Sequence, residues 1–131
     1  YTKEEMKMVD ETKKILNDQS LRITATAVRV PVYYGHSEAI NVEFEKDFDM
    51  DELKGLLASS PGIVLQDDPS KCIYPLATNA EGRGEVFVGR IRRDYSVDFG
   101  VNLWVVADNL LKGAALNTVQ IAEKMMEMGL I

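Results

Sequence analysis

Two side chains with clear chemical potential lie close together in the sequence, in the stretch VRVPVYYGHSEAINVEF of residues 28–44. His36 is the only histidine of the chain, and Arg29 precedes it by seven residues. An imidazole titrates near neutral pH and is suited to proton transfer. A guanidinium group offers two parallel donors that match a carboxylate. The pair therefore suggests a site that holds a carboxylate and moves a proton.

Both residues also have an ordinary structural interpretation. A lone histidine is often a surface or core group, and Arg29 could be paired with one of the 21 acidic residues. Pro31 and Gly35 indicate a turn, so His36 is expected between strands and not in the middle of the core. Working residues concentrate on turns that a rigid scaffold carries, which favours a functional histidine.

The other reactive side chains give weaker signals. Glu4 and Lys7 are three residues apart on a predicted helix, which is typical of a solvated surface pair. Cys72 is the only cysteine and has neither a CxxC partner nor a local activating group, so we assign it no metal and no nucleophilic role. The glycines of GRGEVFVG at 82–89 lead into a predicted strand, which argues against a phosphate-binding loop.

The elements that must position these residues follow from periodicity and caps. Helices are predicted at 3–17, where Thr2 and Glu5 match a capping box, at 50–59 after Asp49, and at 109–128 before Gly129. Strands are predicted at 21–32, 39–46, 85–93 and 101–107, and residues 67–84 are expected to form loops. Strand follows strand with short connections, which predicts an α+β fold with a mostly antiparallel sheet and helices packed on one face.

The strand predicted at 101–107, VNLWVVA, is apolar on both faces. Such a strand is expected to be buried on both sides or to pair across a subunit interface, with Trp104 as the anchor.

Composition limits the classes of partner and compartment. The chain has 131 residues, a formal charge of −6 and 46% hydrophobic residues, which indicates one folded domain. The acidic balance argues against nucleic acid and anionic membranes as partners. No apolar run approaches the length of a membrane span, and the charged start resembles no signal peptide. A single cysteine fits a reducing, cytoplasmic location. Position 1 is not Met, so we expect a fragment.

Four stretches, in order along nearly the whole chain, resemble the C-terminal part of the aspartate-semialdehyde dehydrogenases. They are EEMKMVDETKKIL, VRVPVYYGHSEA, VGRIRRD and WVVADNLLKGAALNTVQIAE. The resemblance implies that residues 1–131 form the dimerisation and catalytic C-terminal domain, part of a fold like that of glyceraldehyde-3-phosphate dehydrogenase. It also implies that an N-terminal NADP-binding Rossmann domain and the segment with the nucleophilic cysteine are absent, and Cys72 does not match that cysteine's motif.

The resemblance further implies roles for individual residues. His36 corresponds to the acid/base group, Arg29 and Glu4 to substrate-binding residues, Lys7 to a phosphate-binding residue and Asn109 to a contact of the cofactor. The reaction implied is the NADP-dependent interconversion of L-aspartate 4-semialdehyde plus phosphate with 4-aspartyl phosphate, in lysine, threonine and methionine biosynthesis. The partners implied are these small molecules and a second subunit of a homodimer, and the isolated fragment is expected to be inactive.

Two other interpretations remain at the level of sequence. One is a free-standing homodimerisation or ligand-binding module without catalysis. The other is a small hydrolase that uses His36 with an unidentified serine. Ser37 is a poor candidate for that serine, because adjacent side chains on an extended chain point apart.

Overall fold

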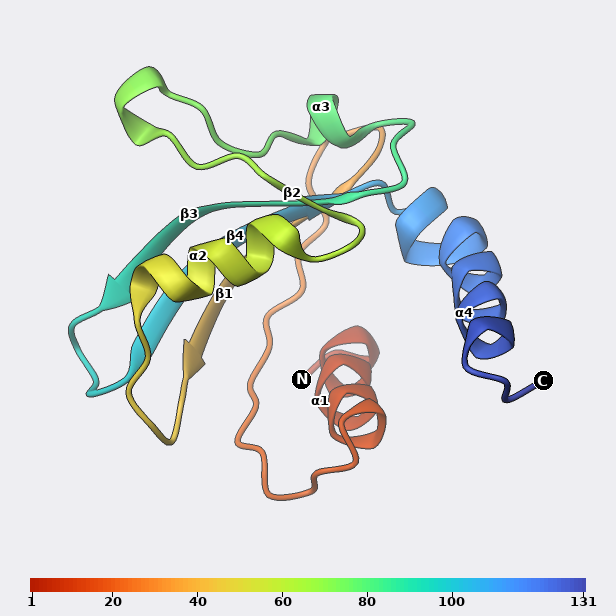
Figure 1. Ribbon diagram of the computed structural model, residues 1–131, viewed down its shortest axis with the longest axis horizontal. Coiled ribbons are helices and arrows are strands. Elements are labelled where there is room, and N and C mark those ends of the chain that lie inside the picture. Colours follow the sequence, from red (N-terminus) through yellow and green to blue (C-terminus); the bar gives the residue numbers. More distant parts are fainter. The chain divides into compact units, whose positions relative to one another are not determined.

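The structure is a computed structural model that describes residues 1–131, and the chain forms two units, Tyr1–Pro31 and Val32–Ile131. Figure 1 labels their helices and strands. None of the helices combines the length and the apolar character that crossing a membrane requires.

The first unit contains one helix, α1, at Lys3–Ile15. The predicted capping box is confirmed. The Glu5 N–H donates to Thr2 Oγ1 at 3.3 Å, and the Thr2 N–H donates to Glu5 Oε2 at 2.6 Å. Acidic residues occupy the first turn and basic residues the last, which complements the helix dipole. The helix ends two residues earlier than predicted, before Asn17 with its φ of 53°.

The prediction of a strand at 21–32 is wrong, because residues 21–30 carry no strand in the structure. A strand needs a neighbouring strand to receive its backbone hydrogen bonds as well as β-forming side chains. The segment instead returns to α1 within the first unit. The Ala27 N–H donates to Glu5 Oε1 at 3.0 Å, and Tyr1 Oη lies 3.3 Å from Thr24 Oγ1. The Glu5 side chain on α1 thus accepts a backbone hydrogen bond that a partner strand would otherwise accept.

The second unit is built on a four-stranded sheet with the order β1-β4-β3-β2. The strands are β1 at His36–Glu43, β2 at Ile63–Leu65, β3 at Val86–Asp94 and β4 at Gly100–Ala107. β4 pairs antiparallel with both β1 and β3, whereas β2 pairs parallel with β3. The α+β class and the mostly antiparallel sheet are therefore confirmed. Strand β2 was not predicted, because its three residues are too few to show a periodicity.

Helix α2 at Met50–Ser59 covers one face of this sheet. Its predicted N-cap is confirmed, since Asp49 Oδ1 accepts from the Asp51 and Glu52 N–H groups at 2.9 and 2.8 Å. Leu53 and Leu57 pack against the buried side chains of this face, which are Val88, Ile91 and Val101.

The opposite face is covered in part by the connection from β2 to β3. This connection carries a short 3₁₀ turn, η1 at Pro69–Lys71, and a four-residue helix, α3 at Ala77–Ala80. Ala80 is fully buried against Phe87 and Val106, and Ala77 and Trp104 pack around them. The main helix of the unit thus lies on one face as predicted, while α3 adds a small cluster on the other.

Beyond β4, the chain forms a π-helical turn, η2 at Leu111–Ala115, which continues into α4 at Leu116–Glu127. Figure 1 shows that α4 extends past the end of the sheet. Gly129 follows with a φ of 66°, so the predicted stop of this helix is confirmed. The loop that precedes η2 returns to the start of β1, and this is where the candidate site lies.

Candidate functional site

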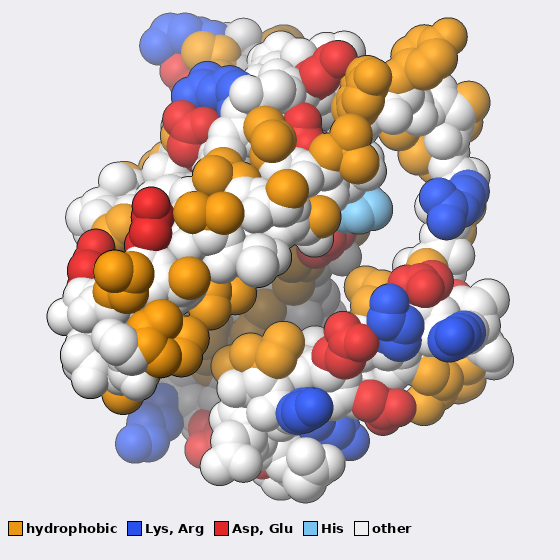
Figure 2. All heavy atoms as spheres, turned by 90° about the vertical axis from the view of Figure 1, so that its right-hand side faces the viewer, with side chains coloured by type: hydrophobic (Ala, Val, Ile, Leu, Met, Phe, Trp, Pro, Cys, Tyr) orange, Lys and Arg blue, Asp and Glu red, His pale blue; other side chains and the backbone are white.

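His36 lies at the end of a strand and not on the free part of a turn. It is the first residue of β1, and it pairs with Ala107, the last residue of β4. Its side chain is exposed, and Figure 2 shows the single histidine of the chain at the surface. Because β1 is an edge strand with a regular partner, the backbone under the imidazole is held by the sheet, while the ring is open to a ligand.

Gly35 allows the backbone to turn sharply just before His36. Its φ is 91°, in the left-handed region that favours glycine. A Cβ atom at this position would lie 3.3 Å from Ala77 Cβ and 3.5 Å from the Ala107 carbonyl oxygen. The positive φ therefore favours glycine at this turn, and a side chain there would also crowd Ala77.

Asn109 holds the same turn through a hydrogen bond to its backbone. The Gly35 N–H donates to Asn109 Oδ1 at 2.7 Å, across 74 residues of sequence. Gly113 in η2 lies next to the histidine, since a Cβ on it would be 3.9 Å from His36 Cδ2 and 3.8 Å from Asn109 Cβ. The structure therefore brings two of the predicted site residues, His36 and Asn109, to one place.

Asp108 anchors the segment that carries Asn109, and sequence reasoning did not identify it. Its side chain is 3% exposed and accepts three backbone hydrogen bonds. The donors are Gly82 N–H to Oδ2 at 2.8 Å, and Leu110 and Leu111 N–H to Oδ1 at 2.7 and 2.9 Å. These bonds, led by that from Gly82, hold the pKa of the Asp108 carboxyl below its ordinary value.

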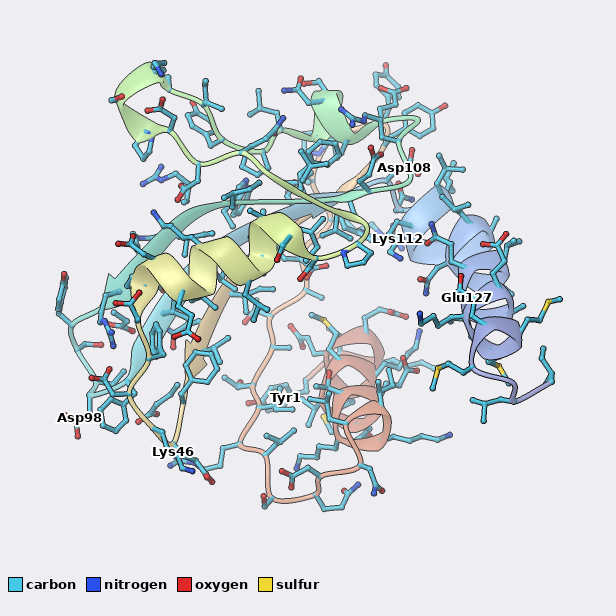
Figure 3. The ribbon with its side chains drawn as sticks, in the orientation of Figure 1. Tyr1, Lys46, Asp98, Asp108, Lys112 and Glu127 are labelled. Carbon is cyan, nitrogen blue, oxygen red and sulfur yellow. The ribbon has the colours of Figure 1, made fainter.

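A signal for Asp108 was present in the sequence. Asp108 follows a predicted strand and directly precedes the helix predicted from residue 109, a position where a carboxylate can accept the first free N–H groups. Figure 3 labels Asp108 and Lys112 at this junction between β4 and α4.

The other predicted site residues belong to the first unit. Glu4 and Lys7 lie on α1, with 3.4 Å between Glu4 Oε2 and Lys7 Nζ, and their side chains are 64% and 47% exposed. Arg29 is exposed in the extended segment after α1. Glu5 ties that segment to the helix, and its hydrogen bonds from the Thr2 and Ala27 backbone lower the pKa of its carboxyl. The roles of Glu4, Lys7 and Arg29 stay predictions.

Cys72 is exposed and follows η1 with a φ of 55°. No group of three or more histidine, cysteine, aspartate or glutamate side chains is arranged to hold a metal ion. Among the described residues, the exposed His36 imidazole is therefore the group suited to proton transfer, and it lies beside Asn109 and Gly113.

Comparison with known families gives a match that covers most of the chain. Residues 1–112 match the family model described as the semialdehyde dehydrogenase dimerisation domain. The chain is 52% identical over 131 residues to the aspartate-semialdehyde dehydrogenase of Aquifex aeolicus, which covers 100% of this chain and 38% of that protein. It is 57% identical over 124 residues to that of Legionella pneumophila, which covers 94% of this chain and 36% of that protein.

Solved structures agree with these relatives. The chain resembles the crystal structure of aspartate semialdehyde dehydrogenase II from Vibrio cholerae complexed with ASA, with a TM-score of 0.90 and 49% identity. The match covers 97% of this chain and 37% of that one. The chain thus spans well under half the length of the proteins that it matches.

Proposed function

Because the chain belongs to the semialdehyde dehydrogenase dimerisation-domain family, we propose that all of its residues, 1–131, form the C-terminal part of a longer aspartate-semialdehyde dehydrogenase. The complete enzyme would also contain an N-terminal Rossmann domain and the segment with the nucleophilic cysteine. The observation that carries the proposal is the single histidine, presented at the end of β1 by Gly35 and Asn109. The agreement with the Vibrio cholerae structure, which contains ASA, supports it.

The reaction proposed is L-aspartate 4-semialdehyde plus phosphate plus NADP⁺, interconverted with 4-aspartyl phosphate, NADPH and a proton. It would serve the cytoplasmic biosynthesis of lysine, threonine and methionine. In this reaction His36 would take the proton of the attacking thiol, return it to the alkoxide formed at the aldehyde carbon, and take it back from that hydroxyl group as the carbon is oxidised. The exposed imidazole on a fixed strand end suits this role, because it can reach a ligand without a change in the backbone.

Three residues of the first unit would bind the other reactants. Arg29 would hold the substrate carboxylate through its guanidinium fork, with Glu4 as a second substrate contact. Lys7 would bind phosphate. The exposure of Glu4 and Lys7 on α1 supports these roles, since both charged groups can meet a ligand.

The described residues fit a nicotinamide cofactor at one point. Asn109 lies beside His36 and uses Oδ1 on the Gly35 N–H, so its Nδ2 amino group is the part that can donate to an oxygen of the cofactor. NADP⁺ would supply the acceptor for hydride when bound. Most of its binding site would be in the N-terminal domain.

A homodimer would form over the sheet face opposite to α2. On that face, a cavity of about 370 Å³ is lined by Ser37, Ala39 and Trp104, and by Arg90 and Arg92. Trp104 is only partly buried within the chain, although its indole N–H donates to the Pro75 carbonyl at 3.0 Å. A second copy would cover the aromatic surface that the chain leaves open, in line with the description of the family as a dimerisation domain.

The test is the activity of the complete gene product and of residues 1–131 alone. The complete protein should reduce NADP⁺ in the presence of the semialdehyde and phosphate, and the chain alone should not, because it holds no activated thiol. Semialdehyde oxidation by residues 1–131, lost on Cys72→Ser, would contradict the proposal. So would a complete open reading frame without an upstream Asn-Cys motif.

A further inference from the structure

We propose that Asn109 is a positioning residue for His36, acting through the hydrogen bond that its side-chain oxygen accepts from the Gly35 N–H. The bond itself is independent of any activity, and its catalytic consequence rests on the function proposed above. Asn109 would then have two roles: its amide oxygen holds the Gly35 turn, and its amino group contacts the cofactor.

The sheet ends directly beside Asn109. The register of β1 and β4 stops at the pair His36–Ala107. Beyond Ala107 the chain turns into η2, and the carbonyl oxygen of Asp108 accepts from Gly113 at 3.0 Å. Asn109 Oδ1 receives the Gly35 N–H at 2.7 Å and so extends the pairing of the two segments by one side-chain hydrogen bond.

Asn109 also projects from a fixed point. Its neighbour Asp108 is almost fully buried and accepts three backbone N–H groups, from Gly82 in the turn after α3, from Leu110, and from Leu111 at the start of η2. A side chain attached to such an anchor loses little further freedom when it binds Gly35. Gly35 also lies against α3, since a Cβ atom on it would be 3.3 Å from Ala77 Cβ. Gly35 is thus held from both sides, and the direction of the following His36 is set.

The two ends of the Asn109 amide differ in polarity. An amide has one acceptor oxygen and one donor amino group. With Oδ1 already accepting from Gly35, the Nδ2 amino group is the end of Asn109 that is left to donate, and a ligand atom bound there is an acceptor. Substitution can separate the two ends, because aspartate keeps the acceptor and loses the donor, whereas alanine loses both.

The first experiment measures hydrogen exchange at the Gly35 amide in the complete protein, by mass spectrometry with fragmentation to single residues. Asn109→Ala should speed this exchange about 3- to 10-fold, as expected when one hydrogen bond is lost. Asn109→Asp should leave the exchange within about twofold of the native rate, because the acceptor remains. Asn102→Ala is the matched control. It removes the 3.1 Å bond from Asn41 in the same strand pair, and it should leave Gly35 unchanged.

The second experiment is a double-mutant cycle on kcat. Asn109→Ala should lower kcat about 10-fold in the native background, and it should cost less than about twofold further when His36→Asn is already present. A residue that served only as a cofactor contact would instead raise the cofactor KM equally in both backgrounds.

Each result decides the proposal. Faster Gly35 exchange restored by aspartate, with a non-additive cycle, supports it. Unchanged Gly35 exchange in Asn109→Ala overturns the hydrogen bond, and an additive cycle overturns the action through His36. If the complete protein has no semialdehyde activity, the proposed function fails, but the exchange experiment still decides whether Asn109 holds the Gly35 turn.

Discussion

At the scale of the residue, the single histidine differs from the other candidates in how the fold supports it. His36 sits where a strand begins, with its backbone paired to β4 and its ring exposed. Gly35 precedes it, and Asn109 and Gly113 reach it from the segment after β4, about 70 residues further along the chain. Such convergence on one exposed imidazole is what a positioned proton-transfer group requires.

His36→Asn in the complete enzyme should lower kcat about 10²- to 10⁴-fold with a modest change in KM, because the amide keeps some hydrogen bonding but cannot transfer a proton. Steady-state kinetics at saturating cofactor measure both constants. Cys72→Ser is the control and should retain native activity, since Cys72 is a lone exposed residue outside the site. A His36→Asn enzyme with native kcat would mean that the histidine is structural.

Arg29→Lys should raise the KM for the semialdehyde about 10- to 100-fold, because lysine keeps the charge but lacks the two-pronged contact with a carboxylate. Turnover should also fall if the aldehyde is held less well in place. Arg22→Lys, in the same extended segment, is the matched control and should leave the KM unchanged. Equal effects of the two substitutions would show that Arg29 has no special contact with the substrate.

At the scale of the element, the site depends on the turn before β1 and on the loop after β4. Neither the turn nor the loop is held by strand or helix hydrogen bonds, so the conformation of each depends on a single residue. The turn relies on glycine at position 35, and the loop relies on the buried carboxylate of Asp108. Both dependences can be tested by single substitutions that leave the strands intact.

Gly35→Ala should destabilise the fold by about 1–3 kcal/mol, because alanine is strained at a positive φ and its methyl group would press on Ala77. Gly82→Ala is a matched control. Gly82 also has a positive φ, of 74°, but a Cβ there would meet nothing within 4 Å. Denaturant unfolding should show a larger loss for Gly35→Ala than for Gly82→Ala, and the excess measures the packing of the turn. Equal losses would show that backbone strain alone matters.

Asp108→Asn should make the thermal midpoint less dependent on pH. The folded-state pKa of Asp108 is lowered, so its carboxylate stabilises the fold above the unfolded pKa of about 3.9 and loses that effect as the pH falls through the folded pKa. The variant should therefore melt below the native protein at pH 7, and the gap should narrow below about pH 4. Thermal scans from pH 7 downward measure this gap. A constant gap across the range would contradict a charged Asp108.

At the scale of the whole molecule, two surfaces remain open in the second unit. One is the sheet face with Trp104, Ser37 and Ala39. The other lies along α4 and the C-terminal residues. Figure 2 views the molecule from the side of α4 and shows hydrophobic side chains along that helix. The large exposed apolar residues there are Val119, Ile121, Met126, Met128, Leu130 and Ile131. Open apolar surface of this kind is typical of interfaces.

Ala39→Asp should weaken the homodimer at least about tenfold, because it places a charge beside Trp104, with which Ala39 pairs across β1 and β4. Sedimentation velocity over a concentration series measures the dissociation constant. Lys46→Glu changes the charge of an exposed residue in the loop after β1 and serves as the control. A dimer unaffected by Ala39→Asp would place the interface elsewhere.

The sequence by itself determined the features that arise from neighbouring residues. The capping box of α1, the Asp49 cap of α2, the stop at Gly129 and the two long strands β3 and β4 all depend on short-range caps or periodicity. The four ordered motifs also indicated the family that the comparisons then showed. His36 stood out because no other imidazole was present.

Only the tertiary structure decided the features that need a distant partner. Residues 21–30 have strand-forming side chains but lack a strand ladder, whereas the three residues of β2 become a strand because β3 is beside them. The bond between Gly35 and Asn109 joins positions 74 residues apart, and Asp108 reaches back 26 residues to Gly82. No local pattern encodes such pairs, because a hydrogen bond forms only where the whole chain brings a donor to its acceptor.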